Sequence, residues 1–386
     1  MSEKLLITNC KLFNAPDEKQ TTSILIEDGV ITQIGQVNPA SCGSIIDAQE
    51  RIIAPGFIDI HIQGAGGADI LDATTDALKA ISQTCARFGT TSFLATTVFK
   101  PNQKNEHLTV AAEYAGQNLG GANLLGIHLE GPFISPQKRG MILPDCLATP
   151  SLNLLDKILD ETRGRLKMMT IAPELPGNLE IVQHLTDSDI IASFGHSNAT
   201  YEQTLDGFEA GISHVTHLFN AMPSLHHRSP GPLVAIFQNQ QVTTQLIADG
   251  VHIHPAVLKF AYQTLGPNRI IPITDGMQAM GLGDGKFIYN GLEYESKNGT
   301  AKYKDGTLIG TALGISQLLE RLMSFTSCPL DVAIKTVTEN PAKLLGIEDK
   351  KGAIAPGKDA DLVLLEPDYS IHTTIVAGKI VFQNAL

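Results

Sequence analysis

A repeated alternation of short apolar segments with helical stretches in the central part of the chain constrains the fold more than any other feature. Strands are expected at residues 57–62, 91–96, 124–129, 168–171, 190–194, 214–217, 244–247 and 270–274. Strands that alternate with helices form parallel sheets, and eight such steps are the number that closes a barrel. The pattern therefore predicts an α/β fold whose centre is a (β/α)8 TIM-like barrel.

The two ends of the chain have a different pattern. Short strands are expected at residues 5–8, 23–27 and 30–34 near the start, and at residues 360–365, 373–376 and 379–382 near the end. Asp28-Gly29 separates two strands of the first set and Ala377-Gly378 two of the second, as in hairpins. Both ends are therefore expected to be β-rich, while the middle is not.

Length, charge and hydropathy exclude several classes of protein. A chain of 386 residues can hold a barrel of ~250 residues and a modest second unit. The formal net charge of −12 argues against nucleic acid or an acidic membrane as a partner, because phosphate binding on that scale needs a basic face. No stretch approaches the ~18 uncharged apolar residues of a membrane helix, and the start of the chain lacks the apolar run of a signal peptide. We therefore expect a cytoplasmic protein.

The cysteines give no sign of a disulfide framework or of a thiolate zinc site. They are scattered and lack CxxC spacing: Cys10, Cys42, Cys85, Cys146 and Cys328. We expect them to be small buried side chains.

Several of the expected barrel strands end in a residue that can bind a metal or move a proton. In a (β/α)8 barrel, the chemistry is located at the carboxyl ends of the strands. Four such residues follow separate strands: Glu130, His196, His217 and Asp275. On the first barrel strand, Asp59, His61 and Gln63 share one face, because strand side chains alternate between faces.

One carboxylate and two imidazoles from different strands can form the protein part of a catalytic zinc or iron site and leave a position for water. Such a metal lowers the pKa of its water towards neutrality. Asp275 would then take a proton from this water and pass it to a leaving nitrogen. Any one of these residues is more often a helix cap or a partner of a backbone group, but four at separate strand ends favour a site.

Two assignments stay open at this point. His128 precedes Glu130 on the same strand face, and either could bind the metal. The Gly131-Pro132 turn favours Glu130 at the rim, with His128 deeper in the barrel. Asp59 either orients a neighbouring ligand or has a purely structural role.

Taken together, the motifs resemble those of the N-acetylglucosamine-6-phosphate deacetylases, which belong to the amidohydrolase superfamily. The matching segments follow one another over nearly the whole chain: PGFIDIH (55–61), HLEGPF (128–133), GHSNAT (195–200), THLFNAM (216–222), ADGVH (248–252), TDG (274–276) and PGKDADLV (356–363). The first of these marks only the superfamily, whereas GHSNAT and THLFNAM are far more specific.

The resemblance implies a β-sandwich domain of residues 1–54 and 353–386 beside a metal-dependent hydrolase barrel of residues 55–352. It implies hydrolysis of the acetamide of an N-acetyl amino-sugar 6-phosphate, first of all N-acetyl-D-glucosamine 6-phosphate, to the free amine and acetate. The N-acetylgalactosamine epimer and another small amide are the alternative substrates. A different amidohydrolase, or a barrel without catalytic activity, is a further alternative.

The resemblance also implies roles for individual residues. Glu130, His196 and His217 are the expected ligands of one tightly bound metal per chain, His61 belongs to a weak second site, and Asp275 is the catalytic acid and base. The expected metal is zinc, with iron, manganese or cobalt as alternatives. The expected substrate-binding residues are Asn220, Ala221, Arg228, Asp249, His252, Ile309, Gly310 and Thr311.

In relatives, the arginine binds the substrate phosphate from the neighbouring subunit, so the resemblance implies a homodimer in which Arg228 reaches the other active site. Arg228 follows two histidines in a polar loop with two prolines and a glycine. A guanidinium forms charge-assisted hydrogen bonds with phosphate. A solvated loop is the alternative interpretation for His226 and His227.

The chain departs from the family pattern at two positions. Gln63 stands where some relatives have a second histidine and bind two metals; an amide is a poor ligand for zinc or iron, so the second site should be weak. Ile142 stands where many relatives have a substrate-binding histidine, and it cannot donate a hydrogen bond.

Overall fold

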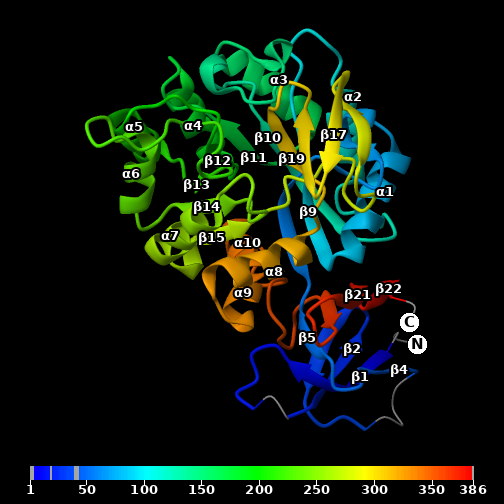
Figure 1. Ribbon diagram of the computed structural model, residues 1–386. Coiled ribbons are helices and arrows are strands. Elements are labelled where there is room, and N and C mark those ends of the chain that lie inside the picture. The colour runs from blue at the N-terminus through cyan, green and yellow to red at the C-terminus, as the bar shows by residue number, and fades with distance from the viewer. Residues whose placement is uncertain (1–3, 18–19, 39–42, 385–386) are drawn as a thin grey trace.

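The computed structural model describes residues 4–17, 20–38 and 43–384, and an eight-stranded parallel sheet forms its centre (Figure 1). The strands are β6 (Phe57–Ile62), β9 (Thr90–Thr97), β10 (Asn123–Glu130), β11 (Leu166–Ile171), β12 (Ile191–Phe194), β13 (His214–Val215), β14 (Thr243–Leu246) and β15 (Ile270–Pro272). Neighbours in the chain are neighbours in the sheet. A parallel bridge between Ile62 and Gly276 joins its two edges and nearly closes the barrel.

A helix follows each barrel strand, as the alternating pattern predicts. These helices are α1 (Thr75–Arg87), α2 (Glu106–Tyr114), α3 (Leu152–Thr162), α4 (Asn178–Asp187), α5 (Tyr201–Ala210), α6 (Gly231–Gln238), α7 (Pro255–Leu265) and α8 (Ile315–Thr326), and α9 (Leu330–Val337) and α10 (Glu339–Leu344) come after them. Apolar side chains at helical spacing turn inward, for example Leu78, Ile81 and Cys85 of α1. The expected α/β architecture with eight parallel strands is therefore confirmed.

The two ends of the chain share a second sheet, which lies below the barrel in Figure 1. Its strands are β1 (Lys4–Leu12), β2 (Thr22–Glu27), β3 (Val30–Ile34), β4 (Ser44–Asp47), β5 (Ile52–Pro55), β20 (Leu362–Leu365), β21 (Ile371–Val376) and β22 (Lys379–Gln383). β5 pairs with β1 on one side and with β20 on the other. The six strands expected at the two ends are all present, whereas β4 and β5 were not anticipated.

The prediction that the middle of the chain is not β-rich is wrong for residues 285–311. Between β15 and α8 the chain forms an antiparallel sheet of four strands: β16 (Gly285–Tyr289), β17 (Leu292–Lys297), β18 (Thr300–Tyr303) and β19 (Leu308–Thr311). Asn290-Gly291 and Asn298-Gly299 form its first two turns, with positive φ at all four residues. These Asn-Gly pairs are a strong hairpin signal, because both residues tolerate positive φ. A smaller hairpin, β7 (Gly64–Ala65) and β8 (Ala68–Asp69), follows β6.

The cysteines within the described ranges agree with the expectation of small buried side chains. Cys10, Cys85, Cys146 and Cys328 are buried free thiols, and Cys42 lies outside the described residues. No helix in the described part of the chain combines the length and apolar character needed to cross a membrane.

Candidate active site

Three polar side chains converge at the carboxyl end of the barrel. Glu130 is the last residue of β10, and His196 and His217 follow β12 and β13. Oε1 of Glu130 lies 3.2 Å from Nε2 of each imidazole, and the two nitrogens are 3.1 Å apart. All three residues are at most 5% exposed. The three ligand atoms lie within 4.8 Å of one another, a spacing that a single metal ion can bridge.

The hydrogen bonds of His196 show that this set fits a metal. Its Nδ1 lies 2.9 Å from the carbonyl oxygen of Lys138, which can only accept a hydrogen bond, so Nδ1 carries the proton. The lone pair of Nε2 then faces Glu130 and the second imidazole. A backbone carbonyl that orients a ligating histidine in this way is common at metal sites. A carboxylate and two imidazoles suit zinc, iron or manganese.

His61 of β6 lies beside the three residues. Its Nδ1 is 2.9 Å from Oε1 of Gln245, and its Nε2 lies 3.6 Å from Oε2 of Glu130 and 3.4 Å from Oδ1 of Asp275. Burial disfavours the charged form of His61, but the carboxylates of Glu130 and Asp275 raise its pKa to about 9. Burial would raise the pKa of Glu130, yet the imidazoles around it hold that pKa well below its usual range.

Asp275 lies opposite His61 at the edge where the barrel closes. Its backbone N–H donates to the carbonyl oxygen of His61 at 2.9 Å, and its carbonyl oxygen accepts from the N–H of Thr311 at 2.9 Å. The side chain of Asp59 accepts hydrogen bonds from the N–H of His61 and from the N–H and hydroxyl of Thr274. Asp59 thus ties the first strand of the barrel to the residue before Asp275.

The backbone is strained at three of these positions. His196, His217 and Asp275 have φ values of 48°, 27° and 45°, a region that residues other than glycine rarely adopt. Such outliers persist where the surrounding structure enforces them, and they gather at functional sites. The tight turns that they form direct the three side chains into the mouth of the barrel.

His128 lies deeper than Glu130, in agreement with its sequence interpretation. Its Nε2 lies 2.8 Å from the hydroxyl of Thr170, and its Nδ1 lies 3.1 Å from the carbonyl oxygen of Ile60. Burial holds the pKa of His128 well below its usual range. Both ring nitrogens are thus occupied by neighbours, which favours Glu130 over His128 as the metal ligand.

A cavity of about 150 Å³ opens above the three converging side chains. Its lining residues are Glu130, Gly140, Met141, His196, His217, Asn220, Ala221, Ile247, His252, Asp275, Leu308 and Ile309. Among the described residues, no lysine or arginine lines it. The cavity is thus lined by both polar and apolar side chains, with imidazoles as its only basic groups within the described ranges.

The expected substrate residues do not all line the cavity. Asn220, Ala221, His252 and Ile309 line the cavity. Asp249 lies behind it and accepts a hydrogen bond from Nδ1 of His252 at 2.7 Å. Burial alone would raise the pKa of Asp249, but its hydrogen bonds to His252 lower it. Asp249 therefore holds the imidazole of His252 in place.

Gly310 and Thr311 support Asp275 rather than line the cavity. A Cβ atom on Gly310 would lie 2.3 Å from the carbonyl oxygen of Asp275, so this position has no room for a side chain. Thr311 donates its hydroxyl to the carbonyl oxygen of Thr274 at 2.8 Å. The two residues hold the segment that carries Asp275.

Arg228 and Ile142 do not line the cavity. Arg228 is exposed, and its Nη1 lies 2.8 Å from Nε2 of His227. Ile142 is 2% exposed and packs with Val98, Ile134 and Cys146. The structure thus places Ile142 in a small apolar core.

Three residues that contribute to the site are not predicted from the sequence. Gln245 of β14 accepts a hydrogen bond at Oε1 from the N–H of His217 and contacts His61, so it orients two of the histidines. It is a polar residue inside an apolar strand segment, which is a usable signal. Gly140 and Met141 line the cavity from a loop, and a Cβ on Gly140 would lie 3.3 Å from the His196 ring. No local pattern predicts their position.

Comparisons with known proteins agree with this geometry. The model of the amidohydrolase family matches residues 52–381. The chain is 38% identical to the N-acetylglucosamine-6-phosphate deacetylase of Bacillus subtilis (strain 168), over 99% of this chain and 98% of the relative. It is 32% identical to an N-acetylgalactosamine-6-phosphate deacetylase of Escherichia coli O157:H7, over 92% and 93% of the two chains.

A solved structure is similar over almost the whole length. It is a mutant of the N-acetyl-D-glucosamine-6-phosphate deacetylase from Mycobacterium smegmatis, in complex with N-acetyl-D-glucosamine-6-phosphate. The TM-score is 0.89 at 30% identity, and the match covers 99% of this chain and 100% of the other. With the match of the family model and these relatives, the chain belongs to the amidohydrolase family and, within it, resembles the N-acetylglucosamine-6-phosphate deacetylases.

Proposed function

We propose that this enzyme hydrolyses the acetamide of N-acetyl-D-glucosamine 6-phosphate and releases acetate and D-glucosamine 6-phosphate. The observation that carries the proposal is the convergence of Glu130, His196 and His217, with Asp275 beside them at the same cavity. The relatives at 38% and 32% identity are named as deacetylases of N-acetylglucosamine 6-phosphate and N-acetylgalactosamine 6-phosphate, and the similar solved structure contains N-acetyl-D-glucosamine-6-phosphate.

Glu130, His196 and His217 would hold the metal, with one ion per chain. A divalent transition metal bound there supplies Lewis acidity, which polarises the acetamide carbonyl and makes an attacking water more acidic. Asp275 accepts the proton of the attacking water at its carboxylate. It then delivers this proton to the sugar nitrogen, because an amide anion is too poor a leaving group to depart unprotonated.

Asn220, His252 and the backbone near Ala221 are proposed to bind the sugar, since they line the cavity. Nδ1 of His252 donates its proton to Asp249, so Nε2 of the neutral imidazole is free to accept a hydrogen bond from a sugar hydroxyl. Ile309 contributes an apolar contact. Gly310 and Thr311 act through Asp275 and do not touch the sugar in this proposal.

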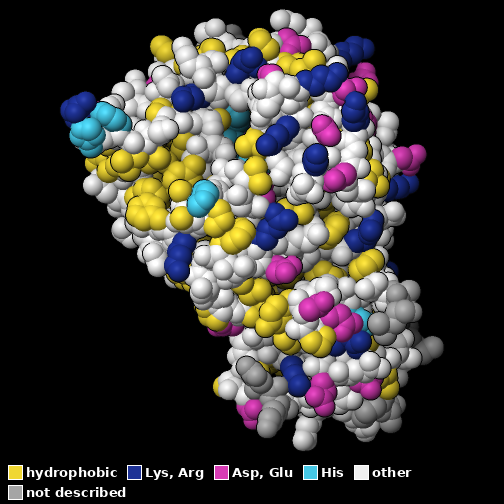
Figure 2. Space-filling model, in the orientation of Figure 1, with side chains coloured by type: hydrophobic (Ala, Val, Ile, Leu, Met, Phe, Trp, Pro, Cys, Tyr) yellow, Lys and Arg dark blue, Asp and Glu magenta, His cyan; other side chains and the backbone are white. Residues whose placement is uncertain are grey.

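Arg228 is proposed to bind the phosphate in the active site of a second subunit. The cavity of one chain lacks a lysine or arginine among its described lining residues, so the phosphate needs a cation from elsewhere. Arg228 is exposed on the loop before α6. Leu225 on this loop and Val257 and Phe260 on α7 are 54%, 39% and 51% exposed. Figure 2 shows hydrophobic side chains over α6 and α7, an apolar surface that suits a homodimer.

The remaining properties follow from the family resemblance. We propose zinc as the native metal, with iron, manganese or cobalt as alternatives, and His61 as part of a weak second site. We further propose that the eight-stranded sheet is a closed barrel over residues 55–352. Residues 1–54 and 353–386 form a β-sandwich beside it, and the enzyme works in the cytoplasm.

An acetate-release assay tests the function. The purified protein, with its metal content measured on the same sample, is given N-acetylglucosamine 6-phosphate, N-acetylgalactosamine 6-phosphate and the two unphosphorylated sugars. We expect the highest kcat/KM for the glucosamine phosphate. A higher value for the galactosamine epimer would change the substrate, and activity without any metal would overturn the mechanism.

A further inference from the structure

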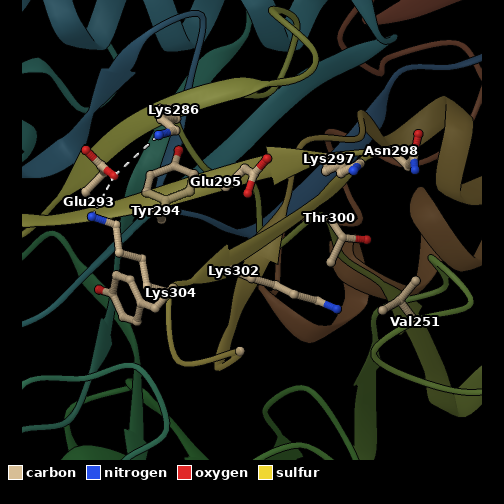
Figure 3. A pocket seen from close by; sticks show the side chains of 12 residues that line it. Val251, Lys286, Glu293, Tyr294, Glu295, Lys297, Asn298, Thr300, Lys302 and Lys304 are labelled. Carbon is tan, nitrogen blue, oxygen red and sulfur yellow. Dashed lines mark ion pairs between the residues drawn. The ribbon is translucent and has the colours of Figure 1, made fainter.

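A second cavity, of about 500 Å³, lies on the outer face of the sheet of β16–β19 (Figure 3). We call this cavity the lysine groove, because four lysines line it together with two glutamates: Lys286, Lys297, Lys302, Lys304, Glu293 and Glu295. Val251 is another of its lining residues. The strand pattern explains why the charged residues gather. On β17, Tyr294 and Ser296 are buried, so Glu293, Glu295 and Lys297, which alternate with them, point outward.

Only part of this positive charge is neutralised. Glu293 lies between Lys286 and Lys304, at 4.0 Å and 2.9 Å (Figure 3). Glu295 stands opposite Lys302 in the strand register. Within the described ranges, no ion pair involves Lys297 or Lys302, and both side chains are exposed. The groove therefore has a surplus of positive charge in a chain whose formal net charge is −12.

The lysine groove lies next to the catalytic cavity. Val251 lines the groove, and the following residue, His252, lines the catalytic cavity. In the same way Gly306 lines the groove, and Leu308 and Ile309 line the cavity. The two openings therefore share a border on two segments of the chain. The side chain of Lys302 extends from β18 toward Val251 on this border (Figure 3).

The negative charge of the protein opposes the approach of a phosphorylated sugar. The whole chain has a formal net charge of −12, so a phosphate dianion is repelled as it approaches. A cluster of one sign of charge at the mouth of a cleft raises the local concentration of an oppositely charged substrate. Exposed lysines suit this role, because they attract as mobile, hydrated point charges and do not hold the ligand.

We propose that the lysine groove attracts the phosphate group of the incoming substrate and guides it to the catalytic cavity, with Lys297 and Lys302 as the main contributors. The inference rests on the proposed function and deepens it. The sheet of β16–β19, which carries none of the proposed metal ligands, thereby has a role in substrate capture. The groove acts before binding is complete, so it differs from the proposed role of Arg228 on the bound phosphate.

The test compares two double variants of the metal-loaded enzyme. Lys297→Gln/Lys302→Gln removes two charges from the groove. Lys350→Gln/Lys379→Gln removes two exposed charges outside it and is the matched control. For each, kcat and KM are measured with N-acetylglucosamine 6-phosphate between about 20 mM and about 500 mM salt, a range over which screening becomes strong.

We expect the groove variant to have a kcat/KM roughly three- to tenfold below wild type at low salt, with kcat unchanged. The difference should vanish at high salt, and Lys302→Glu should lower kcat/KM further. The control should behave as wild type, and unphosphorylated N-acetylglucosamine should be turned over alike by all variants.

Two results would overturn the inference separately from the proposed function. A salt dependence equal to that of the control shows that the groove does not attract the substrate. An equal loss with the unphosphorylated sugar shows a structural effect, which thermal unfolding of the same samples would register. By contrast, a wild-type enzyme that releases no acetate from any phosphorylated hexosamine would overturn the proposed function itself, and the inference with it.

Discussion

The amide nitrogen of Gln63 lies 3.2 Å from Oδ1 of Asp275 and 3.4 Å from Oε2 of Glu130. An amide NH2 group donates hydrogen bonds and offers no lone pair to a metal. Gln63 thus links the proposed proton-transfer residue to a proposed ligand. This arrangement supports the proposal of one tightly bound metal per chain and of only a weak second site at His61.

Removal of either histidine ligand should release the metal. We expect His196→Ala and His217→Ala to lose most of the metal and the activity, because only two of three ligands remain. His184→Ala, on the exposed face of α4, is the control and should keep the full metal content. Elemental analysis of the purified variants checks this. Full occupancy in both ligand variants would refute the assignment.

Asp275→Asn should separate metal binding from turnover. Asparagine has nearly the same size and accepts hydrogen bonds, but it cannot carry a proton between the two steps. We expect kcat per bound metal to fall by ~10²–10⁴ while the metal content stays unchanged. Asp160→Asn on α3 is the control. A near-normal kcat per metal would remove Asp275 from the mechanism.

Arg228→Ala should weaken phosphate binding specifically. The loss of a charge-assisted hydrogen bond removes ~1.5–3 kcal/mol, so KM for the 6-phosphate should rise at least tenfold more than KM for the unphosphorylated sugar. Arg165→Ala, at an exposed arginine directly before β11, is the control. If both substrates were affected equally, Arg228 would not bind phosphate.

Gly310→Ala should disturb Asp275 through the backbone. The new Cβ would lie 2.3 Å from the carbonyl oxygen of Asp275, at a φ of +140°. We expect a loss of stability of ~1–3 kcal/mol and a lower kcat. Gly283→Ala, at a φ of +87° with nothing within 4 Å, is the control, because it adds backbone strain without a clash. Denaturant unfolding and kinetics of both variants distinguish the two effects.

Asp69 should make stability depend on pH. Burial raises its pKa to about 7, and its Oδ2 has no hydrogen-bond partner. The folded state therefore favours the protonated carboxyl, so its contribution is complete below the unfolded pKa of ~4 and is lost as pH rises through about 7.

Asp69→Asn keeps an acceptor for the N–H of Leu71 but cannot ionise. Its melting temperature relative to wild type should rise between about pH 4 and about pH 7 and then level off. A difference that does not change with pH would show that Asp69 does not titrate in this range.

The barrel could be predicted because each strand carries its own signal. The strands β12 and β15, for example, are short, apolar and bounded by turns. Strands that are neighbours in the parallel sheet also follow one another in the chain. The sheet of β16–β19 was missed because its strands are mostly polar on one face and resemble loops in composition. Its Asn-Gly turns are a hairpin signal, but the apolar pattern that predicts the barrel strands does not include them.

The site was predictable to the extent that it depends on strand ends. Glu130, His196, His217 and Asp275 meet because parallel strands of one barrel end at the same rim. The contributions of Gly140 and Met141 depend on the path of a loop, which no local pattern sets. Likewise, Ile142 could be recognised as an unusual residue, but its place in an apolar core depends on long-range packing.

The pairing of Ala54 in β5 with Val363 in β20 bears on how the chain folds during synthesis. The ribosome makes the whole barrel between these two residues, so β5 has no partner on that side until the end of the chain emerges. An unpaired strand edge is where chains pair wrongly with one another. The last strands therefore close the molecule, and a chain cut before β20 would leave an edge open to aggregation.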